Sequence, residues 1–138
     1  MSLFSLFDTA GTALHAQTVR LNTTASNMAN ANSASSSTGE TYRARHAVFA
    51  PIMDEVSGDG ENSIGVRVMG VVESQAPLRS EYNPGHPLAN EEGYIYMPNV
   101  NIVEEMANMI SASRSYQTNV EVMNTAKQML MRTLSLGQ

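Results

Sequence analysis

The sequence has no cysteine and no tryptophan among its 138 residues. Without cysteine there can be no disulfide bond, no thiolate metal ligand and no cysteine nucleophile. Charged residues are also few, at 15% of the chain against about 25% in an average globular protein. Little of the surface is therefore built for permanent contact with water, which is typical of a protein that ends up packed against other chains.

Basic residues are scarcer than acidic ones, with 8 Lys and Arg against 13 Asp and Glu, so the net charge is −5. This balance argues against a basic surface for nucleic acid or for an anionic membrane. No apolar run approaches the ~20 residues of a membrane span. The N-terminus also lacks the basic stretch and apolar core of a cleavable signal peptide. We therefore expect no nucleic-acid partner, and an export route without a cleaved signal peptide if the protein leaves the cytoplasm.

Catalytic and metal-binding patterns are missing as well. The three histidines are far apart in the sequence, and none has a second ligand at i+3 or i+4. The serines at 35–37 have no nucleophile-elbow motif around them. The acidic pairs at 91–92 and 104–105 are adjacent residues, and neighbours on a helix point about 100° apart. The sequence therefore predicts no enzyme, no cofactor, no metal site and no small-molecule substrate.

An apolar seam runs through the first segment, where spacings of four and three residues alternate. This heptad pattern predicts a helix over residues 3–29. We expect its apolar seam residues to be packing positions in an assembly: Leu3, Phe7, Leu14, Leu21 and Met28.

The last segment carries a longer seam of the same kind and predicts a helix over residues 102–136. Asn101 with Glu104 resembles a capping box at its start. Its expected packing positions are Ile102, Met106, Met109, Tyr116, Val120, Met123, Leu130 and Leu134. Further apolar residues lie off this seam: Val103, Ala107, Ile110, Val122, Met129 and Met131. A helix that is apolar on more than one face is usually buried on more than one face.

Between the helices, the chain first passes through an Asn-rich and then a Ser-rich stretch. We interpret Asn27, Asn30 and Asn32 as a joint, because asparagine is a poor helix former and accepts left-handed backbone. The alternative is that they are ordinary polar positions at a helix end. Strands are predicted over residues 42–53 and 64–72, joined by turn residues at 57–62 as a hairpin. Residues 83–85, Asn-Pro-Gly, predict a type II turn.

The predicted fold class is mainly α: long N- and C-terminal helices paired as an elongated coiled coil, with a small central β-hairpin and loop insert. The expected division is an N-terminal axial helix at 1–31, the insert at 32–98 and a C-terminal axial helix at 99–138. A helix of 35 residues is ~52 Å long, whereas a compact chain of this size has a radius of gyration near ~14 Å. We therefore expect the surplus apolar surface of the second helix to pack on neighbouring subunits.

Two stretches resemble a known family. Residues 13–32, ALHAQTVRLNTTASNMANAN, resemble the N-terminal signature of flagellar rod and hook axial proteins, and residues 99–119, NVNIVEEMANMISASRSYQTN, resemble the C-terminal one. The segment HPLANEEGYIYMP at 86–98 is more particular and looks like the C type of basal-body rod protein, a proximal-rod subunit.

That resemblance implies a role which spacing alone does not give. Such proteins leave the cell through the flagellar type III export apparatus without cleavage and assemble in the periplasm. Their terminal helices form a tube around the export channel, and the rod transmits torque. The implied partners are other rod subunits, copies of the chain itself, the basal-body membrane ring and the export gate.

Three other hypotheses remain at the level of sequence. A secreted coiled-coil adaptor would form a discrete folded oligomer in solution. A small cell-wall enzyme would need a pocket where acidic groups converge. A sister subunit of the same rod would be told apart by its position in the assembled rod.

Overall fold

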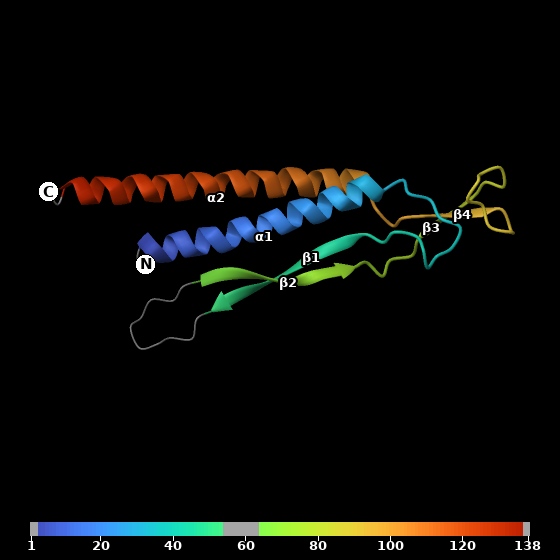
Figure 1. The fold of residues 1–138 in the computed structure, drawn as a ribbon, viewed down its shortest axis with the longest axis horizontal. Coiled ribbons are helices and arrows are strands. Elements are labelled where there is room, and N and C mark those ends of the chain that lie inside the picture. The colour runs from blue at the N-terminus through green and yellow to red at the C-terminus, as the bar shows by residue number, and fades with distance from the viewer. Residues whose placement is uncertain (1–2, 54–63, 137–138) are drawn as a thin grey trace.

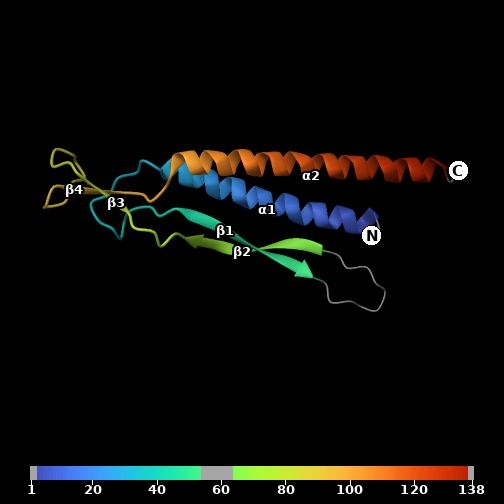
Figure 2. The same cartoon turned by 180° about the vertical axis from the view of Figure 1, so that it is seen from behind.

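The computed structural model describes residues 3–53 and 64–136. Along the chain lie α1 (Leu3–Asn30), β1 (Arg45–Met53), β2 (Ile64–Glu73), β3 (Arg79–Tyr82), β4 (Tyr94–Met97) and α2 (Ile102–Leu136). Helices α1 and α2 run antiparallel side by side, and the β1–β2 hairpin lies along α1 on its other side (Figures 1 and 2). The molecule is elongated, with α1 as the middle of three layers.

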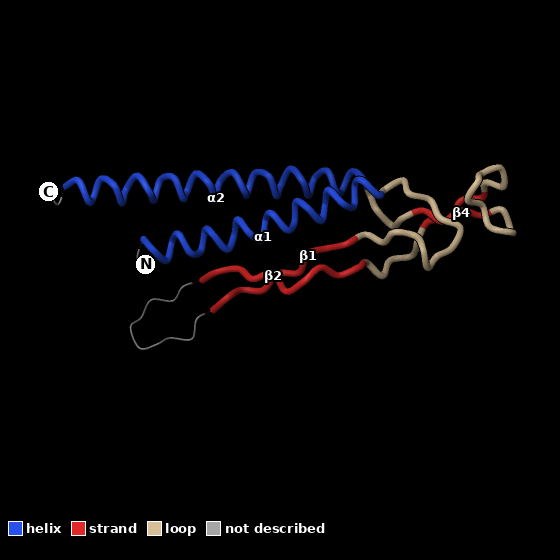
Figure 3. The backbone as a smooth tube through the Cα atoms, viewed as in Figure 1, coloured by secondary structure: helices blue, strands red, loops and turns tan. Residues whose placement is uncertain are grey.

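The predicted fold class is wrong in its strand content. The two helices are present and paired, but the described residues also form two separate two-stranded antiparallel sheets, β1–β2 and β3–β4 (Figure 3). The first is a long hairpin that lies along α1 and is not a small insert. The second was missed because all four side chains of β3 are exposed, so its sequence lacks the alternation that marks a half-buried strand.

The hairpin is held against α1 by a close backbone approach. Its register runs from Arg45 opposite Glu73 to Met53 opposite Ile64, and the predicted turn at 57–62 lies outside the described residues. The Val66 N–H donates to Thr12 Oγ1 of α1 at 3.2 Å. A Cβ on Gly65 would lie 3.1 Å from the same oxygen, so glycine lets the strand come this near.

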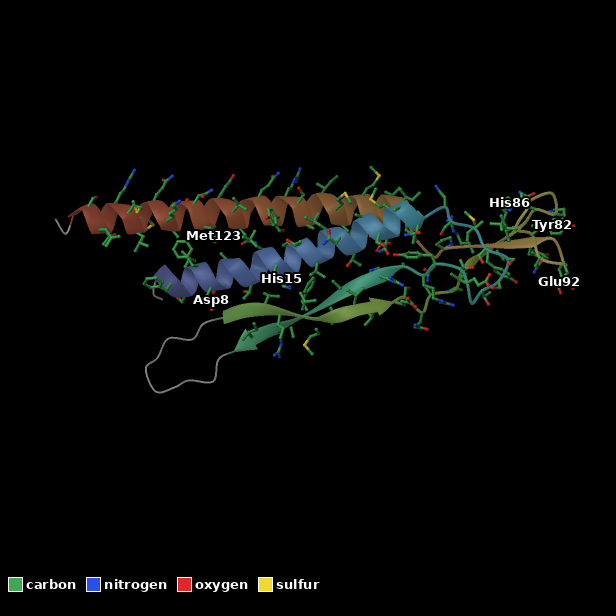
Figure 4. All side chains as sticks on the ribbon, viewed as in Figure 1. Asp8, His15, Tyr82, His86, Glu92 and Met123 are labelled. Atoms are coloured by element: carbon green, nitrogen blue, oxygen red, sulfur yellow. The ribbon has the colours of Figure 1, made fainter. Side chains whose placement is uncertain are left out.

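Small residues dominate the core of the helical part. Ala10 and Ala16 of α1 and Ala112 and Ala126 of α2 are all buried. Since α1 is the element that α2 packs against, Ala112 and Ala126 mark the face of α2 that meets α1. Short side chains at these positions allow the two helices to lie close together. Larger residues on the same face of α2, such as Met123, are half-buried in the contact (Figure 4).

The turn at residues 83–86 forms, but it is not of the predicted type. The His86 N–H donates to the Asn83 carbonyl at 3.1 Å. A type II turn requires a positive φ at its third residue, and Gly85 does not have one; Gly70 and Gly93 are the described glycines that do.

Candidate assembly interface

The outward side of α2 carries an apolar surface near the start of the helix. Val103, Met106 and Ile110 are 76%, 49% and 53% exposed. Their spacing of three and four residues puts them on one side of the helix, roughly opposite Ala112. Farther along, that side becomes polar with Arg114, Gln117 and Glu121. We call Val103, Met106 and Ile110 the α2 patch.

The other end of α2 extends past the start of α1. Arg20 donates to Asn108 Oδ1 at 3.1 Å, which fixes the alignment of the two helices. Antiparallel helices rise equally per residue, so Leu3, the first described residue of α1, lies opposite about residue 125. Roughly the last ten residues of α2 therefore have no helix beside them, as Figure 1 shows. Within this overhang, residues 127–136, the side chains of Met129, Met131 and Leu134 are more than half exposed.

The hairpin adds exposed apolar side chains, which are spread over both of its faces: Val48, Phe49, Met69, Val71 and Val72. Single exposed apolar residues are common on monomers, but clusters of them mark interaction surfaces. The exposed apolar side chains of the α2 patch, the overhang and the hairpin therefore indicate contacts with neighbours on several sides of an elongated chain.

A single amide joins α1 to the chain that leaves it. Asn27 is 1% exposed. Its Oδ1 accepts hydrogen bonds from the Arg45 N–H and the Tyr42 hydroxyl, both at 2.9 Å, and its Nδ2 donates to the Arg45 carbonyl at 2.8 Å. The side chain thus pairs with both backbone groups of Arg45, as a neighbouring strand would, and fixes where β1 begins.

A second asparagine, just before α2, binds backbone groups of two other segments of the chain. Asn99 Oδ1 accepts from the Ala44 N–H at 2.8 Å, and its Nδ2 donates to the Ala76 carbonyl at 2.9 Å. Between the two amides, Ala31, Ala44 and Val100 form a small buried cluster. We call Asn27, Asn99 and these three residues the junction. It ties both helices to the hairpin at one end of the helix pair.

The three asparagines predicted to form a joint differ in their contacts and exposure. Helix α1 ends at Asn30, whose Nδ2 donates to the Ser26 carbonyl at 2.9 Å, and Asn32 is exposed. The left-handed backbone expected of them does not occur, because no non-glycine residue in the described ranges has a positive φ. Asn27 acts through tertiary hydrogen bonds, which no local pattern could reveal.

The predicted packing residues are placed as follows. On α1, Phe7, Leu14, Leu21 and Met28 are half-buried, and Leu3 is the first residue of the helix. On α2, Met109, Val120, Met123 and Leu130 are half-buried, whereas Ile102, Met106, Tyr116 and Leu134 are exposed. The most buried residues of α2 are Glu105, Ala112 and Ala126, so its contact with α1 lies beside the predicted seam.

The asparagine half of the predicted capping box forms at the start of α2. Asn101 Oδ1 accepts from the Val103 N–H at 3.1 Å and from the Glu104 N–H at 3.5 Å. These bonds satisfy backbone donors that a helix leaves unpaired at its first turn. The cap fixes the direction in which α2 leaves the junction, and with it the orientation of the α2 patch.

Cavities and metal-ligand groups offer little chemistry. The cavity of about 750 Å³ beside the junction is lined mainly by Ser, Thr, Gly and Arg residues of 30–45, with Glu73. Within residues 3–53 and 64–136, no three His, Asp or Glu side chains are grouped to hold a metal ion. Neither helix, over its described length, is both long and apolar enough to cross a membrane.

Comparison with known proteins gives two family matches. Residues 7–34 match the family described as flagella basal body rod protein, and residues 91–136 match the flagellar basal body rod FlgEFG protein C-terminal family. These two ranges include most of α1 and α2 and the strand β4.

Three relatives that align over their whole length, or nearly so, are all named flagellar basal-body rod protein FlgC. The chain is 52% identical over 138 residues to flagellar basal-body rod protein FlgC of Salmonella typhimurium, with all of both chains covered. It is 51% identical to FlgC of Yersinia enterocolitica over 138 residues, again with both chains covered completely. The FlgC of Borreliella burgdorferi is 37% identical over 151 residues, covering all of this chain and 99% of the relative.

Proposed function

Because the chain belongs to the family of flagellar basal-body rod proteins, we propose that it is a structural subunit of the basal-body rod. The observation that carries this proposal is the contrast between the two sides of α2. The side against α1 buries Glu105, Ala112 and Ala126, whereas Val103, Met106 and Ile110 are exposed on the other side. Large apolar side chains held outward on a rigid helix are suited to packing against other subunits.

The mechanical role follows from the shape of the helix pair. An uninterrupted helix of 35 residues is ~52 Å long, and α1 braces most of it from the side. We propose that such pairs, packed side by side around an axis, form part of a drive shaft, line the export channel and transmit torque. Heterologous contacts of this kind build an open helical array and not a closed oligomer.

The finer placement is part of the same proposal. The partners are other rod subunits and copies of this chain, with the membrane ring and the export gate at the base of the rod. The site of action is the periplasmic part of the basal body, reached by flagellar export without a cleaved signal peptide. The proposed role is structural and involves no catalysis.

The α2 patch provides the test. The double variant Val103→Asp, Ile110→Asp should be exported at the normal level but should fail to enter rods, and swimming should be lost. Both residues are exposed in the single chain, so the fold should persist. Burying an unpaired carboxylate in a subunit contact costs several kcal/mol.

The matched control is Gln117→Asp, which adds a charge on the polar part of the same side of α2. It should build rods and swim normally. Exported protein, isolated rods and swimming speed are measured in a strain whose own copy of the gene is deleted. Normal swimming by the double variant would remove the α2 patch from the interface.

A further inference from the structure

At the end of the molecule farthest from the overhang, the chain forms a compact loop, residues 80–95, which we call the tip (Figure 1). Its shape depends on hydrogen bonds among its own residues. Asn90 Oδ1 accepts from the Glu92 and Tyr94 N–H groups at 3.1 and 2.8 Å, and the Asn83 N–H donates to the Gly93 carbonyl at 2.9 Å. Gly93 has a φ of 82°, a left-handed conformation that favours glycine.

The tip is also closely packed inside itself. The rings of Tyr82 and Tyr94 meet edge to face with centroids 5.2 Å apart. A Cβ on Gly93 would come within 2.9 Å of the Tyr82 ring. Neither β3 nor β4 packs on another helix or strand of the described chain. Just beyond the tip, Tyr96 exchanges two backbone hydrogen bonds with Ser35, at 2.9 and 3.0 Å, which anchor β4 to the rest of the chain. A loop that is anchored at its base and shaped by its own hydrogen bonds is preorganised for binding, because little conformational entropy is left to lose.

The surface of the tip combines aromatic, apolar and acidic groups. Tyr82, Leu88 and Tyr94 are exposed large side chains. From residue 80 to residue 98 the sequence contains three glutamates, Glu81, Glu91 and Glu92, and no lysine or arginine. Figure 4 shows Tyr82, His86 and Glu92 together at this end of the molecule.

The overhang at the opposite end has the complementary chemistry. From residue 122 to residue 136 the sequence contains Lys127 and Arg132 and no acidic residue. A cavity of about 490 Å³ there is lined by Asn124, Lys127, Gln128, Met131 and Arg132. The nearest acid on the neighbouring helix is Asp8, the one carboxylate of α1. The cavity thus places one apolar side chain, Met131, near two cationic side chains, Lys127 and Arg132.

We propose that the tip of one copy docks on the overhang of a second copy, with Leu88 against Met131 and the tip glutamates facing Lys127 and Arg132. A second copy fits this surface because its tip has the complementary charge and an apolar side chain to set against Met131. The two surfaces lie at opposite ends of an elongated chain and cannot meet within it. Each copy therefore keeps one free tip and one free overhang, and the contact repeats as an open row. This inference rests on the proposed function and names the end-to-end contact within it.

Because the chain has no cysteine, introduced thiols can test the contact directly. Full-length Leu88→Cys and Met131→Cys proteins are mixed in equal amounts and oxidised with diamide. A disulfide-linked pair of the two proteins is expected. The double variant Leu88→Cys, Met131→Cys should give a ladder of linked oligomers, since its ends can join repeatedly.

The matched control replaces Met131→Cys with Val122→Cys, an exposed position on α2 outside the cavity. Its yield with Leu88→Cys should be roughly tenfold lower, which corresponds to about 1.4 kcal/mol of lost contact free energy. Equal yields from the cavity and control positions would overturn the proposal.

Exchange of charges separates a specific contact from random collision. Adding Glu91→Lys and Glu92→Lys to the tip protein should lower the yield of the Leu88–Met131 disulfide several-fold. Adding Lys127→Glu and Arg132→Glu to the other protein should restore it. Circular dichroism of each variant checks that both helices persist, and a loss without rescue in folded proteins would count against the contact.

A third arm identifies the occupant in cells. If Leu88→Cys in assembled rods links only to a different rod protein and never to Met131→Cys of another copy, the second copy is the wrong occupant. That result would leave the proposed function intact, because the α2 patch experiment tests rod assembly separately.

Discussion

At the scale of single residues, a buried amide is one of the best-shielded groups of this molecule. Asn27 and Pro98 are its largest fully buried side chains within the described ranges. The Asn27 amide saturates both backbone groups of Arg45 and also binds the Tyr42 hydroxyl. Removing it would leave several polar groups without partners in a place that water hardly reaches.

Asn27→Ala is therefore expected to destabilise the folded chain by about 3 kcal/mol, since each buried polar group left unpaired costs about 1–3 kcal/mol. Urea unfolding followed by circular dichroism measures the change. Asn32→Ala is the control, because Asn32 is exposed, and its effect should stay within about 0.5 kcal/mol. Equal effects of the two substitutions would show that the asparagines act only through helix propensity.

Two glycines of the tip differ in how far the structure requires glycine at their positions. Gly93→Ala should distort the tip at a cost of about 1–3 kcal/mol, because φ is left-handed there and the new Cβ would strike the Tyr82 ring. Gly85→Ala should be nearly neutral, since the nearest atom to its Cβ, Asn83 Oδ1, is 3.8 Å away. Proton NMR of the Tyr82 and Tyr94 rings reports the outcome; unchanged ring shifts in Gly93→Ala would contradict this account.

At the scale of elements, the two helices depend on close approach. Ala112 is fully buried where α2 meets α1, whereas Ala107 is exposed one and a half turns earlier. The most buried positions of the contact include small residues such as Ala112, and larger residues of the predicted seam, such as Met123, are half-buried in it. A pair held by small residues tolerates little added volume.

Ala112→Leu is expected to destabilise the chain by about 2 kcal/mol, because extra methylene groups in a well-packed contact force the neighbours apart. Ala107→Leu should change stability by less than about 0.5 kcal/mol, since leucine and alanine are both good helix formers. Thermal or urea unfolding of the two variants gives the comparison. A neutral Ala112→Leu would mean that α2 packs on α1 more loosely than this geometry requires.

At the scale of the whole molecule, stability should fall from the junction toward the overhang. Near the junction, α2 is capped by Asn101 and packed on α1, whereas residues 127–136 have no helix beside them. Segments with few packed neighbours open with little free energy, and their amides exchange quickly.

Hydrogen exchange on the free chain should show this gradient within one continuous helix. Amides near Ala112 should be protected most and those after Lys127 least, although both stretches are helical. In assembled rods the protection of the overhang should rise, since a neighbour then covers it. Uniform protection along α2 in the free chain would show that the overhang is stable without a partner.

The sequence by itself determined the two helices, because heptad spacing and an Asn cap act within a few residues of one another. Helix α2 begins and ends where the pattern predicts, and α1 ends one residue later than predicted. The family signatures are likewise read from the order of the residues and do not depend on the fold. Local hydrophobic spacing also located the β1–β2 hairpin, because strand alternation is a short-range signal.

Only the tertiary structure decided which face of α2 meets α1, how β3 finds β4, and what Asn27 binds. Several faces of α2 are apolar, so periodicity could not predict which of them packs on α1. The face that does so carries Ala112 and Ala126, whose short side chains permit a close approach. Strand β3 is held by backbone bonds to β4 while its side chains stay exposed, which leaves no pattern to detect. The partners of Asn27 lie 15 and 18 residues away, and a contact over that separation exists only once the chain has folded.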